Sequence, residues 1–182
     1  MSNSTYEFLN RPDPLTTFFT NLNIESDVYA NGDYVGDWVI DTSGKQRIPF
    51  HGVVSGASQV WLGDKYIDTI YEGDIVLFPF DHSHQMKPID TEQTTRMICG
   101  FFNVKGISHQ RLFEKLPDAI IHSTTQHASN LWQHLANEVD NKQPGFYFAF
   151  NLYAKLLLLD VLRAQLVATG NIASILAGLV ND

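Results

Sequence analysis

The sequence predicts a mostly β fold, a small antiparallel barrel, followed by α-helices at the C-terminal end. From Val28 to Val104, apolar runs of four to seven residues alternate with turn signals such as Gly63-Asp64 and Glu72-Gly73-Asp74. A turn signal about every ten residues is typical of an antiparallel barrel or sandwich. After Val104 the apolar residues recur with a helical period. A chain of 182 residues fits one domain with a core of its own.

The predicted elements divide the chain into three parts. Residues 1–27 are expected to hold a tail and a short helix over 15–22, residues 28–122 the barrel, and residues 123–182 the helices. Within the barrel, Asn31-Gly32-Asp33 is interpreted as a turn, and the run Ile75–Phe78 is apolar on both faces and therefore central. The predicted strands are 34–41, 47–54, 58–62, 66–71, 75–78 and 94–103.

The C-terminal part is predicted to form two helices. Ser129–Val139 is amphipathic, and in the longer segment Phe146–Ala168 18 of 23 residues are apolar. A helix that is apolar nearly all round must be covered on several sides, by the barrel and by either a second copy of the chain or the same subunit. Asp160 and Arg163, three residues apart, are interpreted as a local surface pair. The residues expected at a dimer interface are Leu152, Leu156, Leu159, Leu162 and Leu166.

Composition and charge exclude several classes of protein. The formal net charge of −8 disfavours direct binding to nucleic acid, because such a surface repels phosphates. The N-terminal residues carry no signal-peptide pattern, and Lys155, Asp160 and Arg163 interrupt the most apolar segment, so we expect no membrane span. The single cysteine, Cys99, forms no intramolecular disulfide, which agrees with a cytoplasmic location.

One motif indicates the kind of barrel. The segment from Gly73 to His84 resembles the second cupin motif, in which a glycine, a proline and a histidine recur at fixed spacing, here Gly73, Pro79 and His84. Glycine permits the turn into the strand, and proline ends strand pairing because it lacks an N–H. The family's second glycine is replaced by Asp81 and its asparagine by Pro88. The resemblance implies a cupin, that is a double-stranded β-helix or jelly-roll barrel.

The first cupin motif, which carries the family's metal ligands, is largely missing. Only a strand leading into a glycine turn is left, Phe50–Gly56, and His51 lies about two residues beyond the place of the family's glutamate, on the same face. This departure weakens the expectation of metal-dependent cupin chemistry.

Short motifs with a fixed order run along nearly the whole chain. They are Asp13-Pro14-Leu15, Phe50-His51, Val54-Ser55-Gly56, Gly73-Asp74, Phe78-Pro79, His84, Cys99-Gly100-Phe101-Phe102, Leu116-Pro117 and Pro144-Gly145. This ordered set resembles the cupin-type N-terminal domain of AraC/XylS-type transcription regulators. That resemblance implies a domain that binds a small effector or senses stress, forms a homodimer through its C-terminal helices, and acts on DNA only through a helix-turn-helix domain absent from this chain. The chain ends at Asp182, about where that domain begins in the family, so we expect either part of a longer protein or a stand-alone sensor.

His51, His84 and Cys99 are the candidate site. Two imidazoles and a thiolate suit a divalent metal such as zinc, with water as the fourth ligand, whereas without metal they would line a polar pocket. Cys99 is interpreted as either a redox sensor or a small buried residue. His82 either assists His84 or is a solvated turn residue, and Arg96 either pairs with an anionic effector or is an exposed cation. The candidate pocket residues are Trp38, His51, Trp61, His82, His84, Arg96, Cys99 and Phe101.

Two main hypotheses about function follow. The first is the regulatory domain described above, without catalytic residues. The alternative is a metal-dependent cupin enzyme that acts on a small molecule through His51, His84 and Cys99. A storage or structural cupin is a third, disfavoured by the single short barrel.

Overall fold

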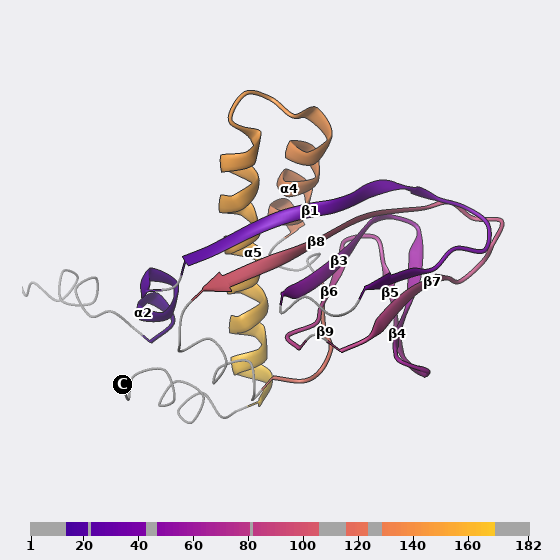
Figure 1. The fold of residues 1–182 in the computed structure, drawn as a ribbon, viewed down its shortest axis with the longest axis horizontal. Helices are drawn as coiled ribbons and strands as arrows, with labels where there is room; N and C mark the ends of the chain where they lie inside the picture. Colours follow the sequence, from indigo (N-terminus) through magenta and orange to yellow (C-terminus); the bar gives the residue numbers. More distant parts are fainter. Residues whose placement is uncertain are drawn as a thin grey trace, which may run out of the picture.

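The computed structural model describes residues 14–21, 23–42, 47–80, 82–105, 116–123 and 129–169. In these residues nine strands form two antiparallel sheets that pack face to face, and two long helices cover the outer face of one sheet (Figure 1). The five-stranded sheet has the order β1-β8-β3-β6-β9, and the four-stranded sheet has the order β2-β7-β4-β5. The elements are α2 (Pro14–Asn21), β1 (Asn23–Tyr34), β2 (Ile40–Thr42), β3 (Ile48–Ser55), β4 (Ala57–Leu62), β5 (Lys65–Tyr71), β6 (Asp74–Leu77), β7 (His84–Pro88), β8 (Thr95–Lys105), β9 (Ile120–Ser123), α4 (Ser129–Asn141) and α5 (Phe146–Thr169).

The central strands of the five-stranded sheet are buried on both faces, and strand alternation divides their residues between two cores. On β3, Ile48 and Phe50 face the helices, whereas His51 and Val53 face the other sheet. The run from Ile48 to Val53 is therefore buried at every position, as a central strand requires. The core between the sheets contains Trp38, Val53, Val60, Ile70, Val76, Phe78, Met86, Met97 and Cys99.

Helix α4 lies directly against the sheet because a glycine makes room for it. A Cβ atom at Gly52 would lie 2.2 Å from the indole ring of Trp132. The Trp132 indole N–H donates to the carbonyl oxygen of Val53 at 3.2 Å, so the ring is both packed and hydrogen-bonded. None of the described helices combines the length and the apolarity that crossing a membrane requires.

Polar contacts fix the helices on the sheet. The backbone N–H of Ser26 on β1 donates to Asn151 Oδ1 on α5 at 2.8 Å. His122 Nε2 on β9 lies 2.9 Å from Asp160 Oδ2 on α5. Asp160 therefore pairs with His122, and the prediction that it pairs with Arg163 is wrong, because β9 brings an imidazole closer than the helix itself does.

Most predicted strands and both long helices are confirmed, but the first strand is wrong. Residues 34–41 do not form one strand, because β1 runs from Asn23 to Tyr34 and β2 begins only at Ile40. Asn31-Gly32-Asp33 is not a turn but lies within β1, paired with Ile98, Met97 and Arg96 of β8. β1 is an edge strand with one largely exposed side, so it tolerates residues that otherwise indicate a turn.

The sequence analysis also missed β7 and β9 and misplaced the start of the sheet. The residues of β7 and β9 were not assigned to strands, because both strands are short and only partly buried. β1 begins before the predicted boundary at residue 28, while the rest of the division into domains stays a prediction. Asp13 and Asp81, which belong to the motifs of the sequence analysis, lie outside the described residues.

Replacing Gly52 by alanine should destabilise the fold by about 1–3 kcal/mol, because the new methyl group overlaps the Trp132 ring. The measurement is urea denaturation followed by circular dichroism. Gly32→Ala is the matched control, since nothing lies within 4 Å of a Cβ atom there, and its effect should stay below about 1 kcal/mol. Equal stabilities of the two variants would contradict this packing.

Candidate functional site

Two histidines from opposite sheets meet in the middle of the core. His51 lies on the inward face of β3 and His84 is the first residue of β7, and neither side chain is exposed to solvent. Their Nε2 atoms are 3.0 Å apart, which is a hydrogen bond. This contact joins the inward faces of the two sheets through two polar side chains.

The hydrogen bonds determine the tautomer of each ring. His84 Nδ1 lies 2.9 Å from the carbonyl oxygen of His82, and because a carbonyl only accepts, Nδ1 must carry the proton. The Nε2 atom of neutral His84 is therefore an acceptor, and His51 Nε2 must donate to it. His51 Nδ1 is then a bare acceptor, and within the described structure this buried atom has no hydrogen-bond partner.

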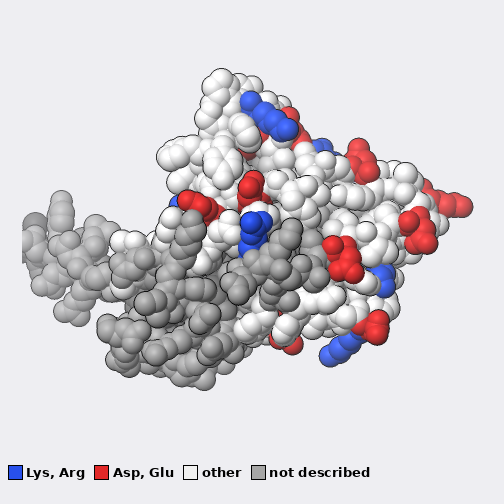
Figure 2. All heavy atoms as spheres, viewed as in Figure 1, with Lys and Arg blue, Asp and Glu red and all other residues white. Residues whose placement is uncertain are grey.

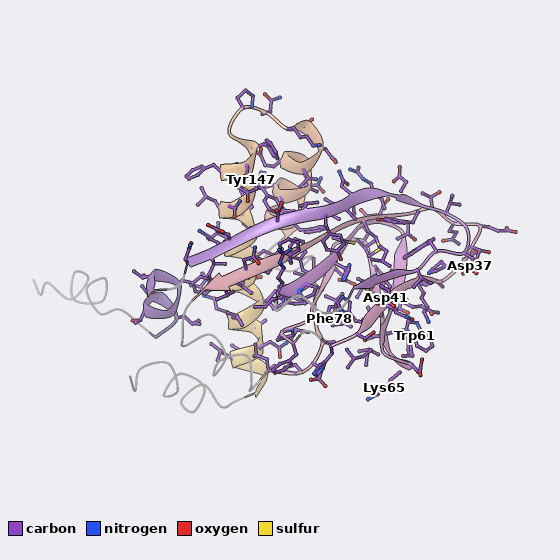
Figure 3. All side chains as sticks on the ribbon, viewed as in Figure 1. Asp37, Asp41, Trp61, Lys65, Phe78 and Tyr147 are labelled. Carbon is purple, nitrogen blue, oxygen red and sulfur yellow. The ribbon has the colours of Figure 1, made fainter. Side chains whose placement is uncertain are left out.

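The surroundings of the pair disfavour a charge on His51. The pKa of His51 is well below its ordinary value of 6.5, because burial disfavours the charged imidazole and because the neighbouring His84 repels a second charge. Phe78, itself fully buried, stacks on His84 with ring centroids 3.9 Å apart and meets His51 edge-on at 5.9 Å. Figure 3 labels Phe78 amid the strands of the two sheets. Because both rings are fully buried, a positive charge on His51 would lack solvation by water.

Cys99 lies beside His51 on the neighbouring strand, and its thiol is buried. It pairs with His51 across the β3–β8 ladder, so the two side chains share the inward face. Burial raises the pKa of the thiol to about 12, although a hydrogen bond from Tyr29 opposes the shift. A redox role needs an accessible thiolate at physiological pH, which this environment disfavours. Of the two interpretations of Cys99, the structure supports the small buried residue.

The residues present fit a metal ion poorly. Two Nε2 atoms at 3.0 Å have the spacing of neighbouring ligands, and His84 Nδ1 is held by a carbonyl, as in many metal-bound histidines. However, a zinc site needs at least a third protein ligand, and the Cys99 thiol resists the deprotonation that ligation requires. Among the described residues no three His, Cys, Asp or Glu side chains are grouped to hold a metal ion.

The remaining predicted pocket residues separate into two groups. Trp38 is buried in the inter-sheet core, and Phe101 lies half-buried at its edge. Trp61, His82 and Arg96 do not line this core, so for them the prediction is wrong. Trp61 lies on the outer face of β4, where Lys87 covers its ring, the His82 ring is exposed, and Arg96 pairs with Asp140 of α4 on the opposite face of β8. Side chains alternate between the two faces of a strand. The sequence alone does not show which of the two sets faces the core, because that depends on how the strands pair.

Two tyrosines near the histidines were missed. β1 has a bulge between Val28 and Ala30, and the residue inside it, Tyr29, packs against His51 at 6.3 Å and donates to Cys99. Tyr34 packs against Trp38 at 5.2 Å, and burial raises its pKa, with a smaller contribution from Cys99. The pattern of the sequence gives no sign of the bulge, which arises from the pairing of β1 with β8.

The five leucines proposed for dimerisation do not share one face. Leu152 and Leu156 are 46% and 47% exposed, and Leu159 is half-buried. Leu162 and Leu166 are 1% and 6% exposed, buried against the sheet of their own chain. The prediction is wrong for these last two, because the barrel covers that side of α5.

Comparison with known proteins identifies one family. A family model described as cupin matches residues 13–167. No curated protein matches the sequence. The match to the family model confirms the predicted barrel type, and it covers most of the chain.

Solved structures with similar folds are distant. ToxT from Vibrio cholerae, solved with an unsaturated fatty acid bound, has 11% identity and a TM-score of 0.49, with 78% of this chain and 55% of that chain covered. YhaK from Escherichia coli has 7% identity and a TM-score of 0.43, with 54% and 43% covered. Oxalate decarboxylase OxdC from Bacillus subtilis has 15% identity and a TM-score of 0.36, with 49% and 23% covered. The chain spans about half the length of ToxT and of YhaK. Likenesses this distant say nothing about function.

Stability should fall as the pH drops below about 6.5, because unfolded His51 takes up a proton that folded His51 resists. The unfolded state then binds more protons, so the free energy of unfolding decreases by up to about 1.4 kcal/mol per pH unit for this residue. Urea denaturation between pH 5 and 8 measures the slope. His51→Gln keeps a donor toward His84 but cannot titrate, so it should lose that part of the slope, whereas the exposed His134→Gln should keep it. An unchanged slope in His51→Gln would contradict a buried neutral pair.

Proposed function

Because this chain belongs to the cupin family, we propose that it is the sensing and dimerising domain of an AraC-type transcription regulator. A small effector binds to the domain, and its preference for one of two arrangements of the dimer controls a DNA-binding domain outside this chain. The observation that carries the proposal is the buried histidine pair: the described barrel interior holds two neutral imidazoles in place of a three-ligand metal centre.

The placement of the sequence motifs supports the regulatory assignment. Phe50-His51 lies on β3, and Cys99-Gly100-Phe101-Phe102 lies beside it on β8, so two of the motifs that resemble AraC/XylS-type regulators form adjacent strands. Gly100 lacks room for a side chain, since a Cβ atom there would lie 2.4 Å from the carbonyl oxygen of Asp27. These motifs therefore have structural reasons to recur together.

The surface supports an indirect role in DNA binding. On the face in Figure 2 the basic side chains of the described residues are isolated and interspersed with acidic ones, without a continuous basic patch. With a formal net charge of −8, the chain would contact DNA through another part of a longer protein.

The exposed side of α5 is the proposed dimer surface. Phe148, Leu152 and Leu156 recur every four residues and are 72%, 46% and 47% exposed, so they form one apolar stripe. An exposed stripe of this kind on a long helix favours burial against a second copy, as the AraC-type resemblance also implies.

The alternative, a metal-dependent cupin enzyme, draws support from the spacing of the two Nε2 atoms. It requires a third ligand, and the raised pKa of Cys99 weighs against the thiol in that role. A stoichiometric metal in protein purified without added metal, lost in His84→Ala, would favour the enzyme.

A reporter assay tests dimerisation. The full chain is fused to a DNA-binding domain that is monomeric by itself and represses a reporter gene only when its fusion partner dimerises. The wild-type fusion should repress the reporter gene. The double variant Leu152→Glu, Leu156→Glu should relieve repression at least about tenfold, because charges in the stripe oppose its burial. Val35→Glu is the matched control, since Val35 is 64% exposed but lies outside α5, and it should still repress. A wild-type fusion that fails to repress, or a double variant that represses fully, would contradict dimerisation through α5.

A further inference from the structure

A cavity of about 390 Å³ lies outside the barrel, between β1 and the connection from α4 to α5. Its volume is in the range of small-molecule sites, about 300–1,000 Å³. On the helix side its wall consists of apolar and aromatic side chains from the end of α4 and the start of α5. They are Val139, Phe146, Tyr147 and Phe150.

On the β1 side the cavity meets an apolar side chain and no carboxylate. Val28 pairs with Gly100 of β8, and its side chain packs against the core beneath the helices. Asp27 pairs with Phe101, so strand alternation places its side chain on the opposite, barrel side. The Tyr29 ring stacks on Phe101 with centroids 6.2 Å apart and lies on the barrel side as well. The wall formed by β1 is therefore apolar.

Lys142 supplies the charge of the cavity. It follows α4, lines the cavity and is exposed, and it makes no ion pair within the described part of the chain. Asp140 on α4 does not compete for an ammonium group, because it pairs with Arg96 and also accepts the amide N–H of Asn31 at 3.2 Å. The first turn of α5 carries no acidic side chain. The cavity thus combines apolar walls with one positive charge.

Lys142 occupies a backbone position that lysine rarely takes. Its φ is +45°, the one positive φ of a non-glycine residue in the described chain, and its N–H caps α4 by donating to the carbonyl oxygen of Glu138 at 3.1 Å. Glycine or asparagine usually fills this position, because a Cβ atom is strained there. A lysine in a strained position beside a cavity points to a role for its ammonium group.

We propose that this cavity binds a monocarboxylate with an apolar, ring-sized body, its carboxylate at Lys142 and its body among Val139, Tyr147 and Phe150. The lysine ammonium donates charge-assisted hydrogen bonds to carboxylate oxygens. Aromatic walls stack on or edge against a ring with a gain beyond burial of area. The proposal rests on the sensing role above and gives the effector its chemical class.

The position of the cavity connects it with the proposed dimer surface. Phe146 and Phe150 line the cavity, whereas Phe148 and Leu152 of the same helix belong to the exposed apolar stripe. A ligand held between β1 and the start of α5 therefore favours one position of the helix that carries the stripe. Its preference for that position sets how far the dimer equilibrium shifts.

Calorimetry on the full chain with three probes tests the site. 3-Phenylpropionate carries both the ring and the carboxylate, 3-phenylpropan-1-ol has the ring without the charge, and acetate has the charge without the ring. 3-Phenylpropionate should bind at least about threefold more tightly than the alcohol, because a charge-assisted hydrogen bond to an exposed ammonium adds a modest gain. Acetate should not bind measurably, because it has almost no apolar surface to bury. Failure of 3-phenylpropionate to bind, or equal affinity for either control probe, would overturn the proposal.

Two substitutions locate the binding. Lys142→Met should weaken binding of 3-phenylpropionate about three- to tenfold and leave the affinity for the alcohol unchanged, because only the charge is lost. Tyr147→Ala should weaken both probes about two- to tenfold, because it removes an aromatic wall. The matched controls are Lys65→Met and Tyr66→Ala, exposed residues of β5 on the side of the molecule away from Tyr147 (Figure 3). Binding that neither site variant changes would overturn the location.

The reporter fusion separates this proposal from the regulatory one. If 3-phenylpropionate binds with the expected variant pattern but leaves repression unchanged, the binding site stands and the sensing role fails. If the fusion represses but 3-phenylpropionate does not bind, dimerisation stands and the assigned effector class fails.

Discussion

The hydrogen bond between His51 and His84 is the constraint on which the described barrel depends. It joins β3 of one sheet to β7 of the other through two fully buried rings whose Nε2 atoms lie 3.0 Å apart. One neutral donor and one neutral acceptor satisfy each other there, so two polar side chains are buried without a charge. The core is consequently organised around neutral imidazoles.

This arrangement explains how a cupin barrel differs here from an open catalytic metal site. The same two nitrogens that would ligate a metal instead bond to each other, Phe78 shields them, and the neighbouring Cys99 thiol has a pKa of about 12. The centre of the described barrel is therefore filled by packed side chains.

The sequence predicted those parts of the fold that depend on local pattern. The Gly73–His84 motif indicated the barrel type, and the apolar periods located α4, α5 and most central strands, because those signals lie within a few residues of each other. The edge strand β1 was missed since Asn31-Gly32-Asp33 indicates a turn by itself and becomes a strand only when β8 pairs with it. For the site, the structure brings His51 and His84 into contact and places Cys99 beside His51 in the β3–β8 ladder. The sequence could not separate Trp61 and Arg96 from the core or find Tyr29, because those placements depend on the register and on a bulge.

The tautomers of the two histidines test this account most directly. Long-range proton–nitrogen correlation NMR on ¹⁵N-labelled protein at pH 7.5 distinguishes the protonated nitrogen of each ring, with His51→Gln and His84→Gln for assignment. The account predicts a proton on Nδ1 of His84 and on Nε2 of His51, with neither ring charged. A charged imidazolium in either ring, or a proton on Nδ1 of both, would contradict the buried neutral bridge.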